Sequence, residues 1–281
     1  MIPSKKKITV ITLMLTFCIF LTSCSIMREQ HHSSSVVQYL YPDQKDQIIT
    51  PSIPRLTLPL KVGVAFVPEN TLRSQALTEI DKMKLMKEVS NHFKQNDFVK
   101  SIELIPSSYL QNKGSFTNLD QIRTMYGVDI ITLLSYDQTR FTDEGFASFT
   151  YWTIIGAYII PGEKNDTHTM VDATVYDIQS RKMLFRAPGV SHIKSNATPI
   201  NLSEQLREDS VKSFDLASKD LIRNLDIQLE LFKDKIKESP EEYQIIRTQG
   251  YTGGGSLDTS FLALFLLLTI LGLRNKKEKS A

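Results

Sequence analysis

Two apolar segments at opposite ends of the chain confine the folded body to the residues between them. In a chain of 281 residues, Ile8–Leu21 carries no charge and Leu257–Leu273 carries only Asp258. Basic residues flank both segments, Lys5–Lys7 before the first and Arg274–Lys279 after the second. The positive-inside rule places both flanks in the cytoplasm, so we expect the intervening chain on the far side of the membrane.

Residues 1–23 have the three parts of a secretory signal: a basic start, an apolar stretch too short for a comfortable bilayer span, and small residues before a cysteine. The sequence Leu21, Thr22, Ser23, Cys24 resembles a bacterial lipobox. This resemblance implies cleavage before Cys24 and attachment of fatty acids there, and Ser25 after the cysteine favours export to the outer membrane. The alternative is an ordinary anchor helix with a chance cysteine.

The C-terminal segment is a marginal span. Ser260–Leu273 reaches roughly 20 Å as a helix, against a hydrocarbon core of about 30 Å. Gly253, Gly254, Gly255 and Ser256 precede it, and glycine disfavours helix by about 1 kcal/mol relative to alanine. We predict a linker with a Gly-rich cleavage region at 239–256, a transmembrane helix at 257–273 and a cytoplasmic basic tail at 274–281. The arrangement resembles the GlyGly-type sorting signal cut by rhombosortases, which are rhomboid-class serine proteases. A plain tail anchor with a glycine linker is the alternative.

With both signals, the chain resembles the rhombotarget lipoprotein family. Three internal segments are also similar to that family: Ser135–Phe141, Tyr151–Gly162 and Val175–Gly189. The resemblance implies lipoprotein-processing enzymes and a rhombosortase-type intramembrane protease as partners. It also implies a precursor in the inner membrane and a mature form held by lipid in the cell envelope, at the outer membrane or the cell surface. It implies no particular activity for the body.

The charge balance of the body argues against nucleic acid as a partner. Without the basic residues of the two ends and the acidic Asp258 and Glu278, 26 basic and 29 acidic residues remain, a net charge of −3. Nucleic-acid binding requires a basic face. Both cysteines, Cys18 and Cys24, precede the body, which therefore contains neither a disulfide nor a cysteine metal site.

Periodicity predicts an α+β domain over 59–238, preceded by a flexible tether over 24–58. Apolar residues spaced three or four apart indicate helices, and short apolar or alternating runs indicate strands. The predicted fold is a mixed β-sheet with helices packed mainly on one face. The expected strands are 60–68, 101–106, 128–138, 148–160, 167–177 and 182–186, and the expected helices are 72–94, 119–126 and about 202–237.

No motif for catalysis, phosphate binding or metal binding is present in the sequence, so we expect no enzyme, no cofactor and no metal site. His92, His168 and His192 stand far apart in the sequence. His31 and His32 are interpreted as part of a solvated linker. The carboxylates Asp137, Asp143 and Glu144 are interpreted as a solvated loop.

Residues 148–160 contain the single tryptophan, Trp152, in a run with little polar alternation. The run is either a strand buried on both faces or a segment that meets another chain or a membrane. Two classes of function remain. The first is a non-catalytic envelope lipoprotein that binds an unidentified protein or cell-wall partner, and the second is a subunit of an oligomeric export or envelope-assembly device with Trp152 at an interface.

Overall fold

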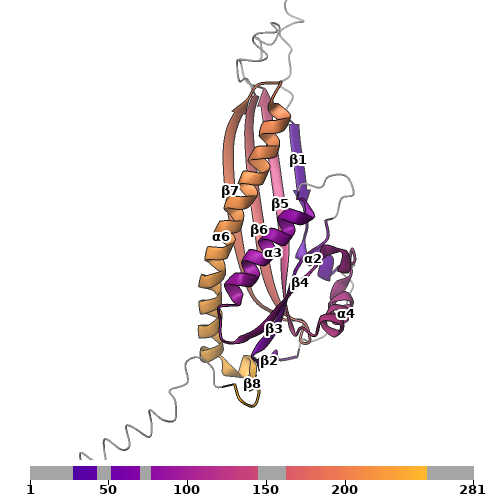
Figure 1. Ribbon diagram of the computed structural model, residues 1–281, viewed down its shortest axis with the longest axis vertical. Coiled ribbons are helices and arrows are strands. Elements are labelled where there is room, and N and C mark those ends of the chain that lie inside the picture. The colour runs from indigo at the N-terminus through magenta and orange to yellow at the C-terminus, as the bar shows by residue number, and fades with distance from the viewer. Residues whose placement is uncertain (1–27, 43–51, 70–76, 145–162, 252–281) are drawn as a thin grey trace, which may run out of the picture.

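The computed structural model describes residues 28–42, 52–69, 77–144 and 163–251 (Figure 1). The larger sheet has the order β4-β3-β5-β6-β7, and β1 also pairs with β5. The strands are β1 (Arg28–Ser33), β3 (Leu60–Phe66), β4 (Val99–Ile105), β5 (Ile130–Glu144), β6 (Glu163–Asp177) and β7 (Met183–Ala197). A second, two-stranded sheet joins β2 (Arg55–Leu58) to β8 (Gln244–Arg247).

The larger sheet is mixed. Strand β3 runs parallel to both β4 and β5, whereas β5, β6 and β7 form an antiparallel meander. Strand β3 pairs with the first part of β5, from Ile130 to Leu134, and β1 pairs antiparallel with its later part, from Asp137 to Thr142. One edge of β5 is therefore shared by two strands that are distant in the chain. The described fold is mixed α+β, which confirms that part of the sequence prediction.

The long helix α6 (Leu202–Glu238) lies along β6 and β7 (Figure 1). At 37 residues it extends about 55 Å, comparable to the 15-residue strands beneath it. Its buried apolar residues recur every three to four positions, as a helix needs in order to face a sheet. They are Phe214, Ala217, Leu221, Leu225, Leu229 and Phe232.

Gly189 of β7 lets the backbone of α6 approach the sheet closely. A Cβ atom at this position would lie 2.1 Å from the carbonyl oxygen of Ala217 and 2.4 Å from the amide nitrogen of Leu221. Both atoms belong to the helix backbone, which cannot move aside as a side chain can. Glycine is therefore required here for packing space rather than for an unusual backbone angle.

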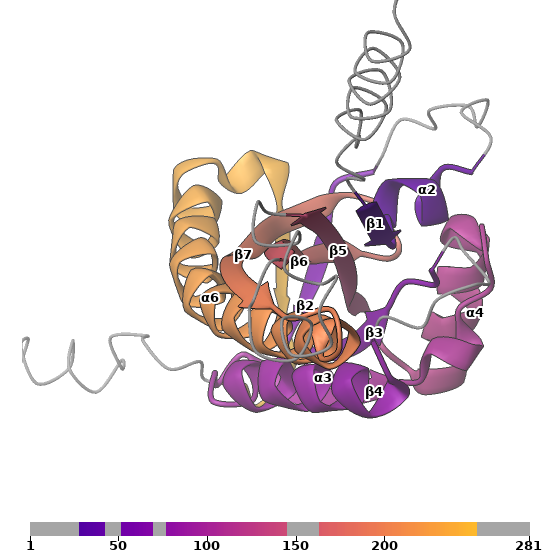
Figure 2. The same cartoon turned by 90° about the horizontal axis from the view of Figure 1, so that it is seen from above.

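Helix α3 (Glu79–Phe93) packs beside α6 on the same face of the sheet (Figure 2). Its start is fixed by a capping box, in which the Thr78 hydroxyl accepts from the Asp81 amide and the Asp81 carboxylate accepts from the Thr78 amide, each at 3.2 Å. Leu85, Met86 and Val89 then enter the same apolar core as Leu221 of α6.

Two shorter helices cover part of the opposite face (Figure 2). These are α2 (Val36–Leu40) and α4 (Ser115–Tyr126), and α4 ends at Gly127, which takes the left-handed conformation with φ 65°. Phe116, Leu119 and Ile122 of α4 share a core with Ile131 and Leu133 of β5. The prediction of helices mainly on one face thus holds for the two long helices, and the structure adds a second helical layer.

The tether predicted over 24–58 is wrong where the structure describes it, because β1, α2 and β2 lie within that range. This stretch is ordered by the backbone pairing of β1 with β5 and by the burial of Val36, Tyr39 and Leu40 in α2. The periodicity of the sequence reveals neither the pairing nor the burial. The linker predicted over 239–256 likewise contains a short 3₁₀ helix, Pro240–Glu242, and β8. The predicted signal peptide at 1–23 and transmembrane helix at 257–273 lie outside the described residues. Within those residues, no helix has the length and apolarity needed to cross a bilayer.

We predict that Gly189→Ala destabilises the domain by roughly 1–3 kcal/mol, because the added methyl group forces α6 away from β7. Urea denaturation followed by circular dichroism measures the free energy of unfolding. Val190→Ala is the matched control, since Val190 is 61% exposed and its truncation should change stability by no more than about 0.5 kcal/mol. Equal effects of the two substitutions would contradict close packing at Gly189.

Candidate functional site

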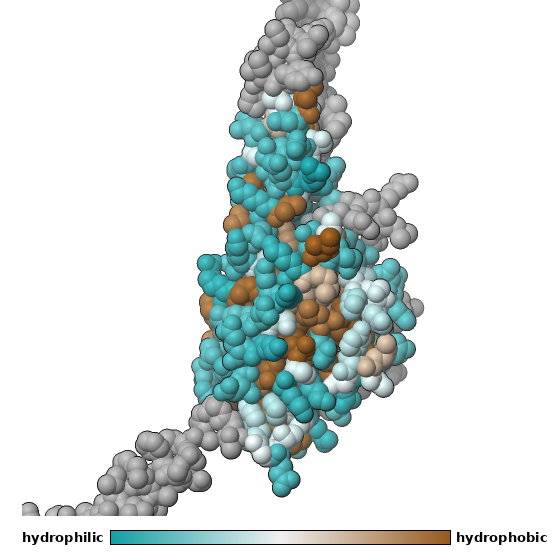
Figure 3. All heavy atoms as spheres, viewed as in Figure 1, coloured by the Kyte–Doolittle hydropathy of each residue, from teal (hydrophilic) through white to brown (hydrophobic). Residues whose placement is uncertain are grey.

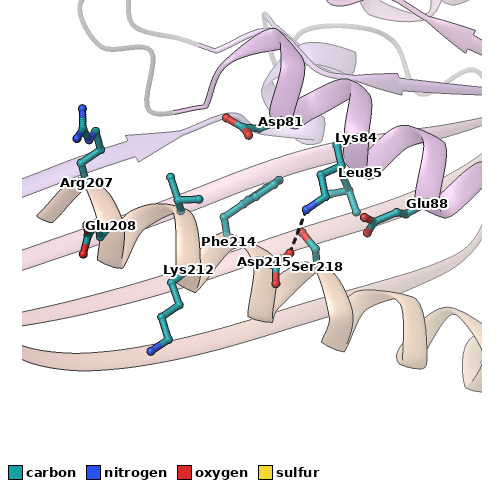
Figure 4. Close-up of a pocket in the computed structure, with 11 residues that line it drawn as sticks. Asp81, Lys84, Leu85, Glu88, Arg207, Glu208, Lys212, Phe214, Asp215 and Ser218 are labelled. Atoms are coloured by element: carbon teal, nitrogen blue, oxygen red, sulfur yellow. Dashed lines mark hydrogen bonds and ion pairs between the residues drawn. The ribbon is translucent and has the colours of Figure 1, made fainter. Parts of the chain in front are cut away.

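A groove of about 520 Å³ runs between α3 and α6 (Figure 4). Its floor is apolar, with Leu85 and Phe214, and its rims carry charges of both signs. Lys84 of α3 and Asp215 of α6 form an ion pair across it, with Nζ 3.3 Å from Oδ1. The lining charges are Asp81, Glu88, Glu208 and Asp215 against Lys84, Arg207 and Lys212. Because the acidic and basic residues nearly balance, the charge of the groove favours neither an anionic nor a cationic ligand.

Asp215 anchors the charges of this groove. Its Oδ2 lies 2.6 Å from Nζ of Lys219, one helical turn away, in addition to the contact with Lys84. The hydrogen bond from Lys219 lowers the pKa of the Asp215 carboxyl, and Lys84 adds to the effect. Asp215 therefore stays ionised and paired within the protein, which makes the groove better suited to packing α3 against α6 than to acid–base chemistry.

A second candidate lies on the opposite face of the sheet, beyond the part that α2 and α4 cover. Buried and exposed residues alternate along β6, with Asn165, Thr167 and Thr169 turned toward α6. The intervening positions are exposed or half-buried, as expected for a sheet with one face in water. We call this surface the open sheet face; it includes Glu29 and His31 of β1, Asp137, Thr139 and Phe141 of β5, Asp166, His168 and Met170 of β6, and Val190, His192 and Lys194 of β7.

Three histidines lie in one row across the open sheet face. The register pairs His31 with Thr139, Thr139 with His168 and His168 with His192, so all four side chains point to the same side. The rings of His168 and His192 are stacked, with centroids 4.1 Å apart and planes 15° apart. A hollow of about 350 Å³ lies beside them.

Aspartates pair with these histidines from the neighbouring rows. Asp166 Oδ1 lies 3.0 Å from Nε2 of His168 and 2.5 Å from Nε2 of His192. On β1, Nε2 of His31 lies 3.0 Å from Oδ1 of Asp137. The cluster Asp166, His168 and His192 brings one carboxylate and two imidazoles together, and each is a type of group that binds transition metals.

The open sheet face ends at an ion pair between Asp172 of β6 and Arg186 of β7. The Nε atom of Arg186 lies 2.7 Å and 2.9 Å from the two carboxylate oxygens of Asp172. Burial raises the pKa of the Asp172 carboxyl, and the contact with Arg186 offsets this only in part. Only 11% of the Asp172 side chain is exposed, against 49% of the Arg186 side chain, which explains why desolvation dominates.

Sequence reasoning missed the histidine cluster, because His168 and His192 stand far apart in the sequence and the register of the two strands brings them together. Thr174 of β6 pairs with Arg186 of β7. From this pair, the register runs without a shift to His168, which therefore pairs with His192. The sequence predicts the turn at 178–182 but makes the flanking strands too short. Extending both strands from that turn without a shift would place His168 opposite Ser191; the register shift between Val175 and Tyr176 places it opposite His192 instead.

The structure also corrects the interpretation of several polar residues. His31 and His32, assigned to a solvated linker, lie in β1. The carboxylates Asp137, Asp143 and Glu144, assigned to a loop, lie in β5. The sequence missed both because polar residues on the water-facing side of a strand resemble loop residues. The predicted lipobox (Leu21, Thr22, Ser23, Cys24), the cleavage region (Gly253, Gly254, Gly255, Ser256) and Trp152 lie outside the described residues.

We predict that the contribution of Asp172 to stability falls as pH rises. Because the folded-state pKa is raised, the folded state binds the proton more tightly than the unfolded state, and stability is lost from the unfolded value of about 3.8 upward. The measurement is the free energy of unfolding of the wild type minus that of Asp172→Asn, from urea titrations between about pH 3.5 and 7. This difference should decrease with pH. A difference that increases would mean that Arg186 outweighs desolvation.

Comparisons with known proteins place the chain in no family. No family matches the sequence, and no curated protein matches it. A putative neuraminyllactose-binding hemagglutinin homolog from Helicobacter pylori is similar in structure, with a TM-score of 0.38 and 8% identity over 68% of this chain and 96% of that one. A PelC dodecamer from Paraburkholderia phytofirmans gives a TM-score of 0.26 and 10% identity over 70% of this chain and 99% of that one. Both similarities are distant.

Proposed function

We propose that the protein is an exported lipoprotein of the bacterial cell envelope, acylated at Cys24 and cut by a rhombosortase-type protease near Gly253–Ser256. Its body acts as a non-catalytic binding module for an envelope protein or a cell-wall component. The precursor resides in the inner membrane, and the mature form is held by its lipid at the outer membrane or the cell surface.

The observation that carries this proposal is that the described domain begins and ends at opposite ends of its long axis (Figure 1). Strand β1 starts at Arg28, four residues after Cys24, and Arg28 pairs with Thr142 near the end of β5. At the other end, β8 pairs with β2, and the Thr248 amide donates to the carbonyl of Leu58. The 12 residues of β5 between Ile130 and Thr142 correspond to about 40 Å.

This geometry determines how the domain is oriented on the membrane before and after the proposed cut. Only the residues 25–27 separate Cys24 from β1, and only Thr252 separates Tyr251 from the glycines. A chain spans at most about 3.5 Å per residue, so neither connection can bridge the length of the domain. A precursor anchored at both ends must therefore lie with its long axis along the bilayer. After cutting at the glycines, the lipid holds one end and the domain can stand away from the membrane.

Two features of the body support binding rather than catalysis. Both cysteines precede the described domain, so no thiol nucleophile is available within it. Large polar surfaces on the sheet and the helices are what a binding module offers.

Acylation is tested by Cys24→Ser, which removes the sulfur that accepts the lipid. We expect complete loss of incorporation of a fatty-acid probe and accumulation of a larger, uncut precursor on a gel. Cys18→Ser is the matched control and should label as the wild type does. Undiminished labelling of the Cys24→Ser variant would refute the lipid site.

Processing at the other end is tested by replacing Gly253, Gly254 and Gly255 with leucine. The substitutions favour helix by about 1 kcal/mol per residue and lengthen the apolar span, so cutting should stop and the protein should stay in the inner membrane. Membrane fractionation with an antibody to the body measures the result. Recovery of this variant in the outer membrane at wild-type size would leave the glycines as a simple linker to a tail anchor.

An alternative function, a subunit of an oligomeric export or assembly device, has one observation in its favour. Strand β4 is an edge of the sheet, and no described strand pairs with its outer side. Its partly buried residues Ile102 and Leu104, with the nearby Phe98, contribute apolar surface, and apolar atoms gather over this region in Figure 3. An unpaired apolar edge can add a strand from a second chain. Light scattering of residues 25–250 separates the two functions, since a monomer contradicts the oligomer.

A further inference from the structure

The cluster on the open sheet face has the composition and geometry of a transition-metal site. Asp166 and His168 lie two residues apart on β6, so both side chains point to the same face, and His192 is the direct cross-strand partner of His168 on β7. One ligand atom from each of the three residues lies within 4.8 Å of the other two. We propose that Asp166, His168 and His192 bind one divalent transition-metal ion of the zinc class. This inference does not depend on the lipid anchor or on processing.

The distances among the three residues are close to those that a metal site needs. Both Nε2 atoms converge on a single oxygen of Asp166, at 3.0 Å and 2.5 Å. Nitrogen and oxygen ligands lie about 2.0–2.2 Å from Zn²⁺, which separates the ligand atoms of a tetrahedral site by roughly 3.3 Å. The ligand atoms therefore need to move apart by less than about 1 Å. Asp166 is half-buried and the imidazoles are partly exposed, so rotation of side chains can supply this movement.

The stacked rings provide a second argument. With centroids 4.1 Å apart and planes 15° apart, the two imidazoles lie side by side, with both Nε2 atoms next to Asp166. A metal ion would bind both rings in their neutral form and supply the positive charge between them and Asp166. Phe141 contacts the edge of the His168 ring, with centroids 6.3 Å apart.

The ligand types select the class of metal. Two imidazoles and one carboxylate suit Zn²⁺, Ni²⁺, Co²⁺ and Cu²⁺, whereas Ca²⁺ and Mg²⁺ prefer six or more oxygen ligands. Three protein ligands leave a fourth coordination position open. The hollow lined by Asp137, Thr139, Met170 and Ser191 adjoins both histidines, so water or a ligand atom from a partner can reach the site.

One cation competes with the metal. Nζ of Lys194 lies 3.9 Å from Oδ2 of Asp166, and 74% of the Lys194 side chain is exposed. The lysine can move into water when a metal binds, so it weakens the site without blocking it. Removing the charge of Lys194 should therefore tighten metal binding. If the cluster forms only surface ion pairs, this substitution should not increase the affinity for metal.

The test is Zn²⁺ titration of the full chain, purified in detergent without a polyhistidine tag, by isothermal calorimetry. Visible absorption of bound Co²⁺ reports the coordination geometry independently. We expect one ion per chain, no comparable binding of Ca²⁺ or Mg²⁺, and a rise in melting temperature on addition of Zn²⁺. Cys18 and Cys24 are present in every variant, so differences between variants report on the cluster.

The matched variants are His192→Ala, which removes a ligand, and His92→Ala, which removes a histidine that pairs with Asp226 on another surface. We expect Zn²⁺ affinity to fall at least about tenfold in the first and to stay unchanged in the second. Lys194→Ala should tighten binding by roughly two- to fivefold. Circular dichroism confirms folding of each variant. Absence of Zn²⁺ binding by the wild type, or equal binding by His192→Ala, would overturn the proposal and leave the cluster as a surface ion pair.

Discussion

The close approach of α6 to β7 at Gly189 is the contact on which the rest of the structure depends. It allows a 37-residue helix to lie directly on the β6–β7 hairpin and so decides which face of the hairpin is covered. Since side chains alternate along a strand, that choice fixes the direction of every other residue in β6 and β7. His168 and His192 reach water because Thr169 and its neighbours point toward the helix. The cluster with Asp166 is thus a consequence of packing on the opposite face.

The interface beneath α6 changes in chemistry along its length. Toward the C-terminal half of the helix, Leu221, Leu225 and Leu229 form an apolar core with β5 and β6. Toward the N-terminal half, polar groups meet instead. Nε2 of Gln138 donates to Oγ1 of Thr169 at 2.8 Å and to the carbonyl of Ser210 at 3.2 Å. Burial of an apolar side chain contributes about 1.5–3 kcal/mol, and a typical hydrogen bond about 1 kcal/mol net. The two halves therefore contribute unequally to stability, and the polar half lies beside the part of β5 that pairs with β1.

Periodicity identifies the elements that bury regular apolar faces. Helix α6, predicted at 202–237, forms at Leu202–Glu238, and the strand predicted at 60–68 forms at Leu60–Phe66. Strand β1 could not be found in this way, because its sequence Arg28–Ser33 is polar and it is held by backbone pairing to β5. The histidine cluster was missed for a related reason. Its residues carry no motif in sequence, and the pairing of two 15-residue strands was needed to bring them together. The groove between α3 and α6 likewise depends on how two helices lie side by side.

The position of β1 has a consequence for the proposed export of the chain. Its partner strand follows more than 100 residues later, as the contact between His31 and Asp137 illustrates with a separation of 106 residues. A chain that crosses the membrane from its N-terminus exposes β1 well before β5 arrives, and closing so long a loop is slow. Until then, Arg28–Ser33 have no strand to pair with. If Cys24 is acylated as we propose, the acylating enzyme would therefore meet a polypeptide whose first strand is still unpaired. The sheet can close only after β5 has arrived, which leaves an interval for modification before folding is complete.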